Sequence, residues 1–476
     1  MLETLAGLDL DPVEAGTFTK AADSMGLPKP TAYPWIRSTL AVVGTVLLIG
    51  LPGIERRDPL QPLLSSRPAL WVGLRSYSLY LWHWPVYVLA RWTTGLSVWP
   101  FNLIAVALSF AAAAVCYRAI ENPVRHSPTL KQWRPSSRIA IFVLVLGLGW
   151  LAGHTLQAQQ PALGLGQPTR QAADWYGDRQ LLKTALAASR QCEPSVQYGP
   201  VGGTARGLTA FVPEGCTSRA AAQLFVIGDS HATAYLPMLE QLSAEQGRTV
   251  KVLQVPGCAY IDMMAPMDPA LDGHCHRMAQ ASMQVVLEQA RPGDIVFLPS
   301  LRLPRLIELG GARRQPAPGP SPAPGDVYSR AAGELASIRQ AAQDAPRWFV
   351  PFVDAGLHVV FELPKPVLRA HPFHCVDWFN RNNPDCAGGL SEGRADQERF
   401  RAAVVQAVNT LVAAHPGMSV WDPLPLLCNE AECPALRAGR PLFFDADHVS
   451  PYGNLVLLHA FKKAVRAAVA LPAGTS

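Results

Sequence analysis

Residue types suited to nucleophilic catalysis occur at two places that lie far apart in the sequence. Ser230 follows the apolar run Leu224–Ile227 within the tetrapeptide Gly-Asp-Ser-His, and Asp445 and His448 lie three residues apart near the C-terminus. A serine hydroxyl becomes a nucleophile when an imidazole accepts its proton, and a carboxylate on the other ring nitrogen fixes the tautomer. The pattern predicts acyl transfer, with Ser230 as nucleophile, His448 as general base and Asp445 as the orienting acid.

Two alternatives stay open at this level. Asp447 is a competing carboxylate, although its position directly beside His448 suits the contact less well than the position of Asp445. A Gly-Asp-Ser sequence by itself is also compatible with a plain cap between a strand and a helix.

Apolar runs of strand length alternate with longer segments of helical character from Cys192 onward. The expected strands are Gln223–Ile227, Val250–Val255, Asp294–Leu298, Leu357–Glu362 and Met418–Trp421. The expected helices are Ala234–Glu245, Arg277–Gln289, Ser329–Gln343, Arg394–Ala414 and Tyr452–Ala468. Continuous apolar strands between helices indicate an α/β domain with a parallel sheet flanked by helices. Ligands bind such sheets at the carboxyl ends of the strands, so Ser230 is expected at that edge, where free helix N–H groups can stabilise an oxyanion.

The part of the chain before residue 158 has a different composition. Its apolar stretches are Ile36–Gly53, Ser76–Trp92, Val98–Ala119 and Ile139–Gln157. Each is near the length of about 20 residues that a helix needs to cross a bilayer, and tryptophans lie near their ends. Arginines are concentrated in the loops after the first and third stretches, which places these loops in the cytoplasm and both chain ends outside. About four transmembrane spans are therefore expected, with buried helices of a soluble core as the alternative.

Cysteine usage agrees with an oxidising compartment for the C-terminal part. Cys116 lies in an apolar stretch, and the other eight cysteines all follow residue 190. We expect neighbours in sequence to form disulfides, as Cys192/Cys216, Cys258/Cys275, Cys375/Cys386 and Cys428/Cys433. A zinc site around the cluster His274–His276 is the rival interpretation, but no Cys-x-x-Cys pair supports it.

The charge balance argues against a nucleic-acid partner. The formal net charge of the 476 residues is only +5, and no long basic run occurs.

The strand-Gly-Asp-Ser-His and Asp-x-x-His pattern resembles the SGNH (GDSL-like) hydrolase and acyltransferase family from about Cys192 to the C-terminus. The resemblance implies the same roles for the three residues named above. It also implies that Gly257, after the second strand, donates a backbone N–H to the oxyanion. The asparagine of the family's third block is absent, and Leu298–Arg305 stands in its place. His231 and Arg302 are further candidates for oxyanion or substrate contacts, and Arg302 is equally compatible with a structural role at the surface.

A second resemblance lies in the apolar part. The segment Ser76–Pro85 (SYSLYLWHWP) and the segment Glu121–Arg125 (ENPVR) are similar to the last spans of the acyltransferase-3 family, whose members acylate surface glycans. The family's earlier spans have no counterpart here, so we expect this chain to be either the C-terminal portion of a longer protein or a truncated gene product. The expected organisation is an extracytoplasmic flank (1–35), a partial acyltransferase-3 region (36–125), a cytoplasmic loop with the last span (126–160), a connector (161–190) and a periplasmic SGNH domain (191–476).

Together the resemblances imply O-acetylation of a cell-envelope polysaccharide, such as lipopolysaccharide O-antigen or capsule, at the bacterial inner membrane. They imply acetyl-CoA as acyl donor, with no bound cofactor and no metal. The expected partners are the glycan acceptor, the lipid bilayer and the missing N-terminal spans. Two other functions remain open: a carbohydrate O-acetylesterase with the same triad, and an inactive fragment that binds glycan or a partner chain.

Overall fold

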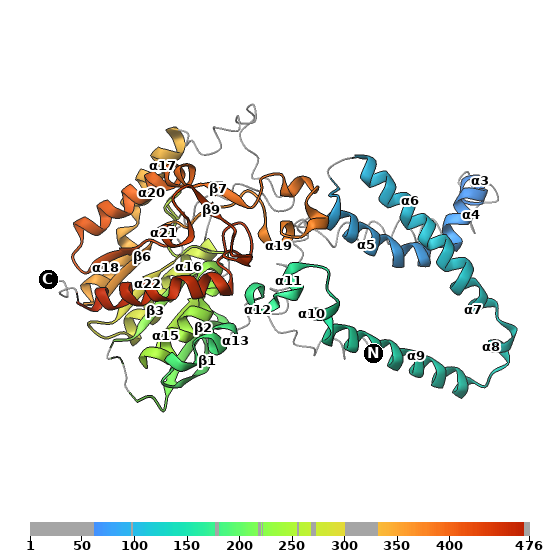
Figure 1. The fold of residues 1–476 in the computed structure, drawn as a ribbon, viewed down its shortest axis with the longest axis horizontal. Helices are drawn as coiled ribbons and strands as arrows, with labels where there is room; N and C mark the ends of the chain where they lie inside the picture. Colours follow the sequence, from blue (N-terminus) through green and yellow to red (C-terminus); the bar gives the residue numbers. More distant parts are fainter. Residues whose placement is uncertain are drawn as a thin grey trace. The chain divides into compact units, whose positions relative to one another are not determined.

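The computed structural model describes residues 61–96, 99–176, 180–217, 220, 222–254, 257–267, 273–299 and 332–470. The chain divides into two compact units, one made mainly of residues up to Thr155 and the other mainly of residues from Leu156 onward. The first is helical and the second contains the sheet (Figure 1).

The described residues of the first unit form helices. They are α3 (Gln61–Leu64), α4 (Arg67–Leu74), α5 (Ser76–Thr93), α6 (Trp99–Cys116), a π-helical turn (Tyr117–Glu121), α7 (Asn122–His126), α8 (Pro128–Gln132) and α9 (Pro135–Ala158). Helix α6 buries the small residues Ala105, Ser109 and Ala113, which recur every four residues along one face. Its large apolar residues, such as Leu103 and Leu108, are exposed. Small residues inside and large apolar residues outside are typical of helices that pack together in lipid.

Two described segments are long and apolar enough to cross a membrane, Trp99–Gln132 and Pro135–Ala158. They contain the fourth predicted span and the third from Trp99 onward. The second predicted span forms helix α5, but polar residues including Arg91 interrupt its apolar surface and it is not among these segments. The first, Ile36–Gly53, lies outside the described residues. The expectation of about four spans is thus supported for two of them.

The predicted connector belongs to the second unit and contains short helices. They are α10 (Gln160–Leu163), α11 (Gln167–Arg170), α12 (Ala172–Trp175), α13 (Gln180–Ala185) and a 3₁₀ turn (Ala187–Ser189). Trp175 is fully buried, and both carboxylate oxygens of Asp174 accept hydrogen bonds from Arg440 at 2.7 and 2.8 Å. These contacts attach the connector firmly to the last third of the chain.

The second unit is built on a seven-stranded sheet of order β1-β2-β4-β3-β5-β6-β8. The strands are β1 (Glu193–Val201), β2 (Thr204–Glu214), β3 (Leu224–Gly228), β4 (Val250–Gln254), β5 (Ile295–Leu298), β6 (His358–Glu362) and β8 (Met418–Trp421). The five strands β4, β3, β5, β6 and β8 are parallel and match the five predicted strands. Every residue of β3, β5 and β6 is buried, as is typical of central parallel strands, whereas β4 and β8 include partly exposed positions.

The antiparallel hairpin of β1 and β2 was not predicted. Prolines and glycines in Glu193–Val201 disguise a strand, but proline is tolerated here because β1 lies at the edge of the sheet. The turn Gly202–Gly203 has φ of +55° and +87°, a geometry that hairpin turns require and that glycine adopts without strain. This Gly-Gly pair is the signal that could have revealed the hairpin.

Helices cover both faces of the sheet (Figure 1). One face carries α16 (Gly273–Gln289), α17 (Ala332–Asp344), α18 (Pro346–Asp354) and α20 (Arg394–Ala414), and the other carries α14 (Ser230–Ala234), α15 (Leu236–Gln246) and α22 (Pro451–Ala470). Strand β5 shows the division, since Val296 and Leu298 join the first core while Ile295 and Phe297 join the second. The sequence predicted all of these helices except α18 and the single turn α14, which precedes the predicted helix Ala234–Glu245.

Short elements complete the second unit after β6. They are α19 (Pro372–Cys375), two 3₁₀ turns (Trp378–Asn380 and Pro384–Cys386), β7 (Ser391–Gly393), α21 (Leu424–Leu427), β9 (Glu432–Pro434), β10 (Leu436–Arg437) and β11 (Arg440–Pro441).

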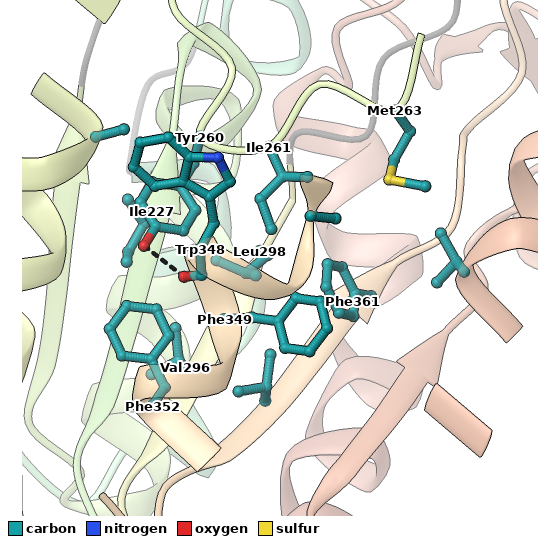
Figure 2. Close-up of a cluster of buried hydrophobic side chains, with 14 of the residues drawn as sticks. Ile227, Tyr260, Ile261, Met263, Val296, Leu298, Trp348, Phe349, Phe352 and Phe361 are labelled. Carbon is teal, nitrogen blue, oxygen red and sulfur yellow. Dashed lines mark hydrogen bonds between the residues drawn. The ribbon is translucent and has the colours of Figure 1, made fainter. Parts of the chain in front are cut away.

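The first core is rich in aromatic residues from α18 (Figure 2). Phe349 is fully buried and meets Phe361 of β6 edge-to-face, with ring centroids 5.6 Å apart. The buried hydroxyl of Tyr260 donates to the carbonyl oxygen of Trp348 at 2.8 Å, so its polar end is satisfied inside the core.

All four predicted disulfides are confirmed. They join Cys192 to Cys216, Cys258 to Cys275, Cys375 to Cys386 and Cys428 to Cys433, and Cys116 is free. Because Cys275 is disulfide-bonded, the zinc interpretation of His274–His276 is wrong.

The Phe349→Ala substitution should lower the free energy of unfolding of the second unit by about 3–5 kcal/mol, because it leaves a cavity beside β6. Urea unfolding of the detergent-solubilised chain, followed by near-UV circular dichroism, measures the change. Leu287→Ala, at a position of α16 that is 38% exposed, is the matched control and should change stability far less. Equal losses in the two variants would contradict the assigned core.

Candidate active site

The serine lies where the central parallel strand turns into a helix. All residues of β3 are buried, and Ser230 is the first residue of α14. Asp229 caps this helix: its buried carboxylate accepts the backbone N–H of His231 at 2.8 Å. The cap leaves the Ser230 side chain at the carboxyl edge of the sheet, as the sequence predicted, and it fixes the first turn of the helix.

The aspartate and histidine lie in a tight loop just before α22. The Oδ1 atom of Asp445 accepts the backbone N–H groups of Asp447 and His448 at 3.0 and 2.8 Å. The loop is closed by the backbone N–H of Phe444, which donates to the His448 carbonyl oxygen at 2.8 Å. The same carboxylate therefore shapes the turn and faces the imidazole.

The three residues form a continuous chain of hydrogen bonds. His448 Nε2 lies 2.8 Å from Ser230 Oγ, and His448 Nδ1 lies 2.8 Å from Asp445 Oδ2. The fold thus brings together groups 218 residues apart in sequence. With Nδ1 donating to the carboxylate, Nε2 is positioned to accept the serine proton, which is the arrangement that nucleophilic acyl transfer requires.

The pKa of His448 reflects two opposing influences. Burial is the largest single one and lowers the pKa, but the carboxylates of Asp445 and Asp447 together outweigh it and raise the pKa from 6.5 to about 9. The imidazole is consequently mostly protonated at neutral pH, and its capacity to accept the Ser230 proton grows as the pH rises towards 9.

Asp447 contacts the same imidazole more directly than the sequence suggested. Its Oδ1 lies 3.1 Å from His448 Nδ1, compared with 2.8 Å for Asp445 Oδ2, and its Oδ2 lies 3.7 Å from His231 Nε2. The His231 ring stacks on the His448 ring with centroids 4.4 Å apart. In the sequence, the only signal for this ring stacking is that His231 directly follows the nucleophile Ser230.

One possible ligand atom from each of His231, Asp447 and His448 lies within 4.8 Å of the other two, which is close enough for a metal ion to be considered. The two imidazole rings are stacked with their planes inclined by only 15°, so their lone pairs lie in two separate, nearly parallel planes and converge poorly on one ion. The cluster of His374, Cys375 and Cys386 is committed to a disulfide. We therefore assign no metal ligand among these residues.

The structure describes two of the three residues predicted to contact the oxyanion or substrate, Gly257 and His231, but not Arg302. Gly257 has φ of +83° and follows β4, the neighbour of β3, so its location after the second parallel strand is as expected. Arg302 lies outside the described residues. The backbone N–H of His231 already donates to Asp229, and its side chain faces His448. Their oxyanion or substrate roles stay predictions.

The start of α22 ties the two halves of the site together. Asn454 donates from Nδ2 to the Ala234 carbonyl oxygen, at the end of α14, and to the Ser450 carbonyl oxygen, both at 2.9 Å. Ser450 Oγ accepts the Gly453 backbone N–H at 2.9 Å. A Cβ atom on Gly453 would lie 2.2 Å from the Leu442 carbonyl oxygen, so only glycine allows this close approach.

The Gly453→Ala substitution should lower ester hydrolysis about 10-fold or more, because the clash pushes α22 and the loop of His448 away from Ser230. Initial rates with a chromogenic acetyl ester measure the effect. Gly333→Ala is the control: it is also helical, but nothing lies within 4 Å of the added Cβ. An unchanged rate in Gly453→Ala would show that the close approach does not position the site.

The rate of ester hydrolysis should rise with pH to a plateau above about pH 9, the pKa of His448. Asp445→Asn should move the midpoint of the rate profile to lower pH, because it removes the main charge that raises this pKa. It should also lower the plateau by up to about 10⁴-fold, because the imidazole tautomer is no longer fixed. A midpoint near pH 6.5 in the unsubstituted chain would contradict the analysis.

Protonated His448 also stabilises the fold below pH 6.5, and this contribution to stability is lost as the pH rises through about 9.

Comparison with known proteins places this geometry in a family. A family model described as "SGNH domain (fused to AT3 domains)" matches residues 203–463. The chain is 30% identical over 89 residues to the peptidoglycan O-acetyltransferase OatA of Listeria monocytogenes, covering 18% of this chain and 14% of that protein. It is 42% identical over 64 residues to the O-acetyltransferase OatA of Staphylococcus aureus, covering 13% and 11%. The chain spans less than a fifth of the length of these curated relatives.

Among solved structures, the periplasmic domain of a lipopolysaccharide acetyltransferase from Salmonella ser. Paratyphi A matches 53% of this chain and 86% of its own length, with 14% identity and a TM-score of 0.33. The family model spans more than half of the 476 residues and contains Ser230, Asp445 and His448. This protein therefore belongs to the family of SGNH domains that are fused to AT3 domains.

Proposed function

We propose that this protein is an O-acyltransferase that places an acetyl group on a hydroxyl of a cell-envelope polysaccharide, through an ester on Ser230. The hydrogen-bond chain from Ser230 through His448 to Asp445 is the observation that carries the proposal. Membership of the SGNH family supports it, as do similar stretches in relatives named as O-acetyltransferases, one of them of peptidoglycan.

The proposed reaction has two halves that balance in protons. In the first, Ser230 Oγ attacks the acyl carbonyl carbon while its proton passes to His448 Nε2, and the leaving group departs with that proton. In the second, a sugar hydroxyl gives its proton to Nε2 and attacks the Ser230 ester. The sugar ester leaves, and the proton returns to Ser230 Oγ. Asp445 stays ionised and stabilises the imidazolium in both halves.

We propose a cellular setting for the reaction that features of both units support. Disulfides in the second unit are typical of an oxidising compartment, and the apolar helices α6 and α9 are suited to a bilayer. We place the enzyme in the bacterial plasma membrane, with the sheet domain outside the cytoplasm. Acetyl-CoA as the ultimate donor rests on the resemblance to the acyltransferase-3 family, and membrane spans of that family would have to relay the acetyl group.

The test is to trap the acyl-enzyme on the full chain in detergent micelles. After incubation with a chromogenic acetyl ester and an acid quench, mass spectrometry should find one acetyl group on the peptide that contains Ser230. His448→Ala should acylate far more slowly, and Ser230→Ala should carry no acetyl group at this position. Wild-type turnover by Ser230→Ala would overturn the proposal.

A second arm separates transfer from hydrolysis. Purified peptidoglycan fragments or O-antigen polysaccharide are added to the acetylated enzyme, and the acetylated glycan and free acetate are measured. Acetylated glycan in excess of free acetate supports the transferase. Faster removal of acetyl groups from a pre-acetylated glycan would identify an esterase with the same triad instead.

A further inference from the structure

The catalytic imidazole is covered on one face by a second imidazole. The ring of His231 stacks on the ring of His448, with centroids 4.4 Å apart and planes inclined by 15°. His231 is only 8% exposed, and its position is fixed because the first turn of α14 is capped through its own backbone N–H. A parallel ring at this separation obstructs rotation of His448 about its Cβ–Cγ bond, the motion that would carry Nε2 away from Ser230.

The edge of the imidazole is held by a second carboxylate. Asp447 Oδ1 lies 3.1 Å from His448 Nδ1, and Asp447 Oδ2 lies 3.7 Å from His231 Nε2. One carboxylate thus contacts both rings of the stack. Asp447 is 9% exposed, so its charge acts with little screening by solvent.

The described charged and titratable groups around His448 come from two elements. Its own loop contributes Asp445 and Asp447, and α14 contributes His231 beside the hydroxyl of Ser230. Asp445 makes the hydrogen bonds that define the tautomer, and it also shapes the turn through two backbone N–H groups. Asp447 and His231 are left to act on the orientation and charge of the ring.

We propose that His231 and Asp447 form a positioning pair, which holds the His448 ring in the plane where Nε2 reaches Ser230 Oγ. The stacked ring of His231 prevents rotation, and the Asp447 carboxylate links the two rings and adds a second negative charge next to the imidazolium. This role rests on the proposed function of Ser230 as nucleophile, and it differs from an oxyanion contact by His231.

The experiment measures the pH dependence of kcat/KM for a chromogenic acetyl ester, with the full chain in detergent micelles. Asp447→Asn should move the midpoint to lower pH by about one unit, because a nearby opposite charge no longer favours the imidazolium. Asp396→Asn removes a carboxylate from an ion pair with Arg399 on the surface of α20, and it should leave the midpoint in place. A midpoint does not depend on the fraction of folded enzyme, so partial loss of protein does not obscure the result.

Two substitutions of His231 test the stacking. His231→Ala should lower the plateau of kcat/KM by up to about 10-fold, the value of one stacked ring pair. His231→Phe keeps a flat ring without the polar edge, and it should restore most of this loss. The rate at which a fluorophosphonate probe inactivates each variant reports Ser230 reactivity independently and should fall in the same order.

The outcomes separate this inference from the proposed function. Ser230→Ala is the reference: if it retains turnover, the proposed function fails and the positioning pair fails with it. If Ser230→Ala is inactive but Asp447→Asn keeps the wild-type midpoint, only the inference is overturned. Equal impairment of His231→Phe and His231→Ala likewise overturns it, because a flat ring at this position then does not restore the loss.

Discussion

The function of the C-terminal domain depends on one hydrogen bond. His448 Nε2 must stay 2.8 Å from the hydroxyl of Ser230, which lies 218 residues earlier in the chain. The hydroxyl is placed by the buried strand β3 and by the Asp229 cap of α14. The imidazole is placed by the turn that Asp445 organises. Neither arrangement alone can maintain the hydrogen bond between Ser230 and His448, because each positions only one of its two partners. The two ends are joined where Asn454, at the start of α22, donates to the last carbonyl of α14.

The electrostatics of the site combine a buried base with two carboxylates. Burial by itself would favour neutral His448, and the ionised Asp445 and Asp447 reverse that preference. Such a base is held tightly in its charged form, which stabilises the imidazolium that forms when the serine is deprotonated. The same stabilisation reduces the fraction of neutral imidazole at neutral pH. The arrangement therefore makes His448 a stronger base, of which a smaller fraction is neutral at pH 7, and both carboxylates contribute to this shift.

The two units bury different side chains: small residues in the helical unit and large apolar residues in the sheet unit. In α6 the small residues Ala105, Ser109 and Ala113 face inward and the large apolar residues face outward, whereas in the sheet domain the large apolar side chains of β3 and β5 are inside. The first pattern needs an apolar solvent and the second needs water. Four disulfides link neighbouring cysteines within the second unit, each closing a loop of 24 residues or fewer. A chain with both patterns is suited to a membrane protein with a domain outside the cytoplasm.

By itself the sequence determined the parallel strands, most of the long helices, the disulfide pairs and the candidate triad, because these depend on local apolar runs and short spacings. It missed the hairpin of β1 and β2, whose prolines and glycines are tolerated only because β1 is an edge strand. It ranked Asp447 below Asp445, but it could not show that Asp447 lies 3.1 Å from the same ring nitrogen. It also could not show that His231 covers His448, since this contact joins α14 to a loop more than 200 residues away. The need for glycine at 453 likewise comes from the Leu442 carbonyl oxygen, which approaches only in the folded chain. Tertiary structure decided these features, because stacking, charge contacts and close approach depend on distances that spacing along the chain does not determine.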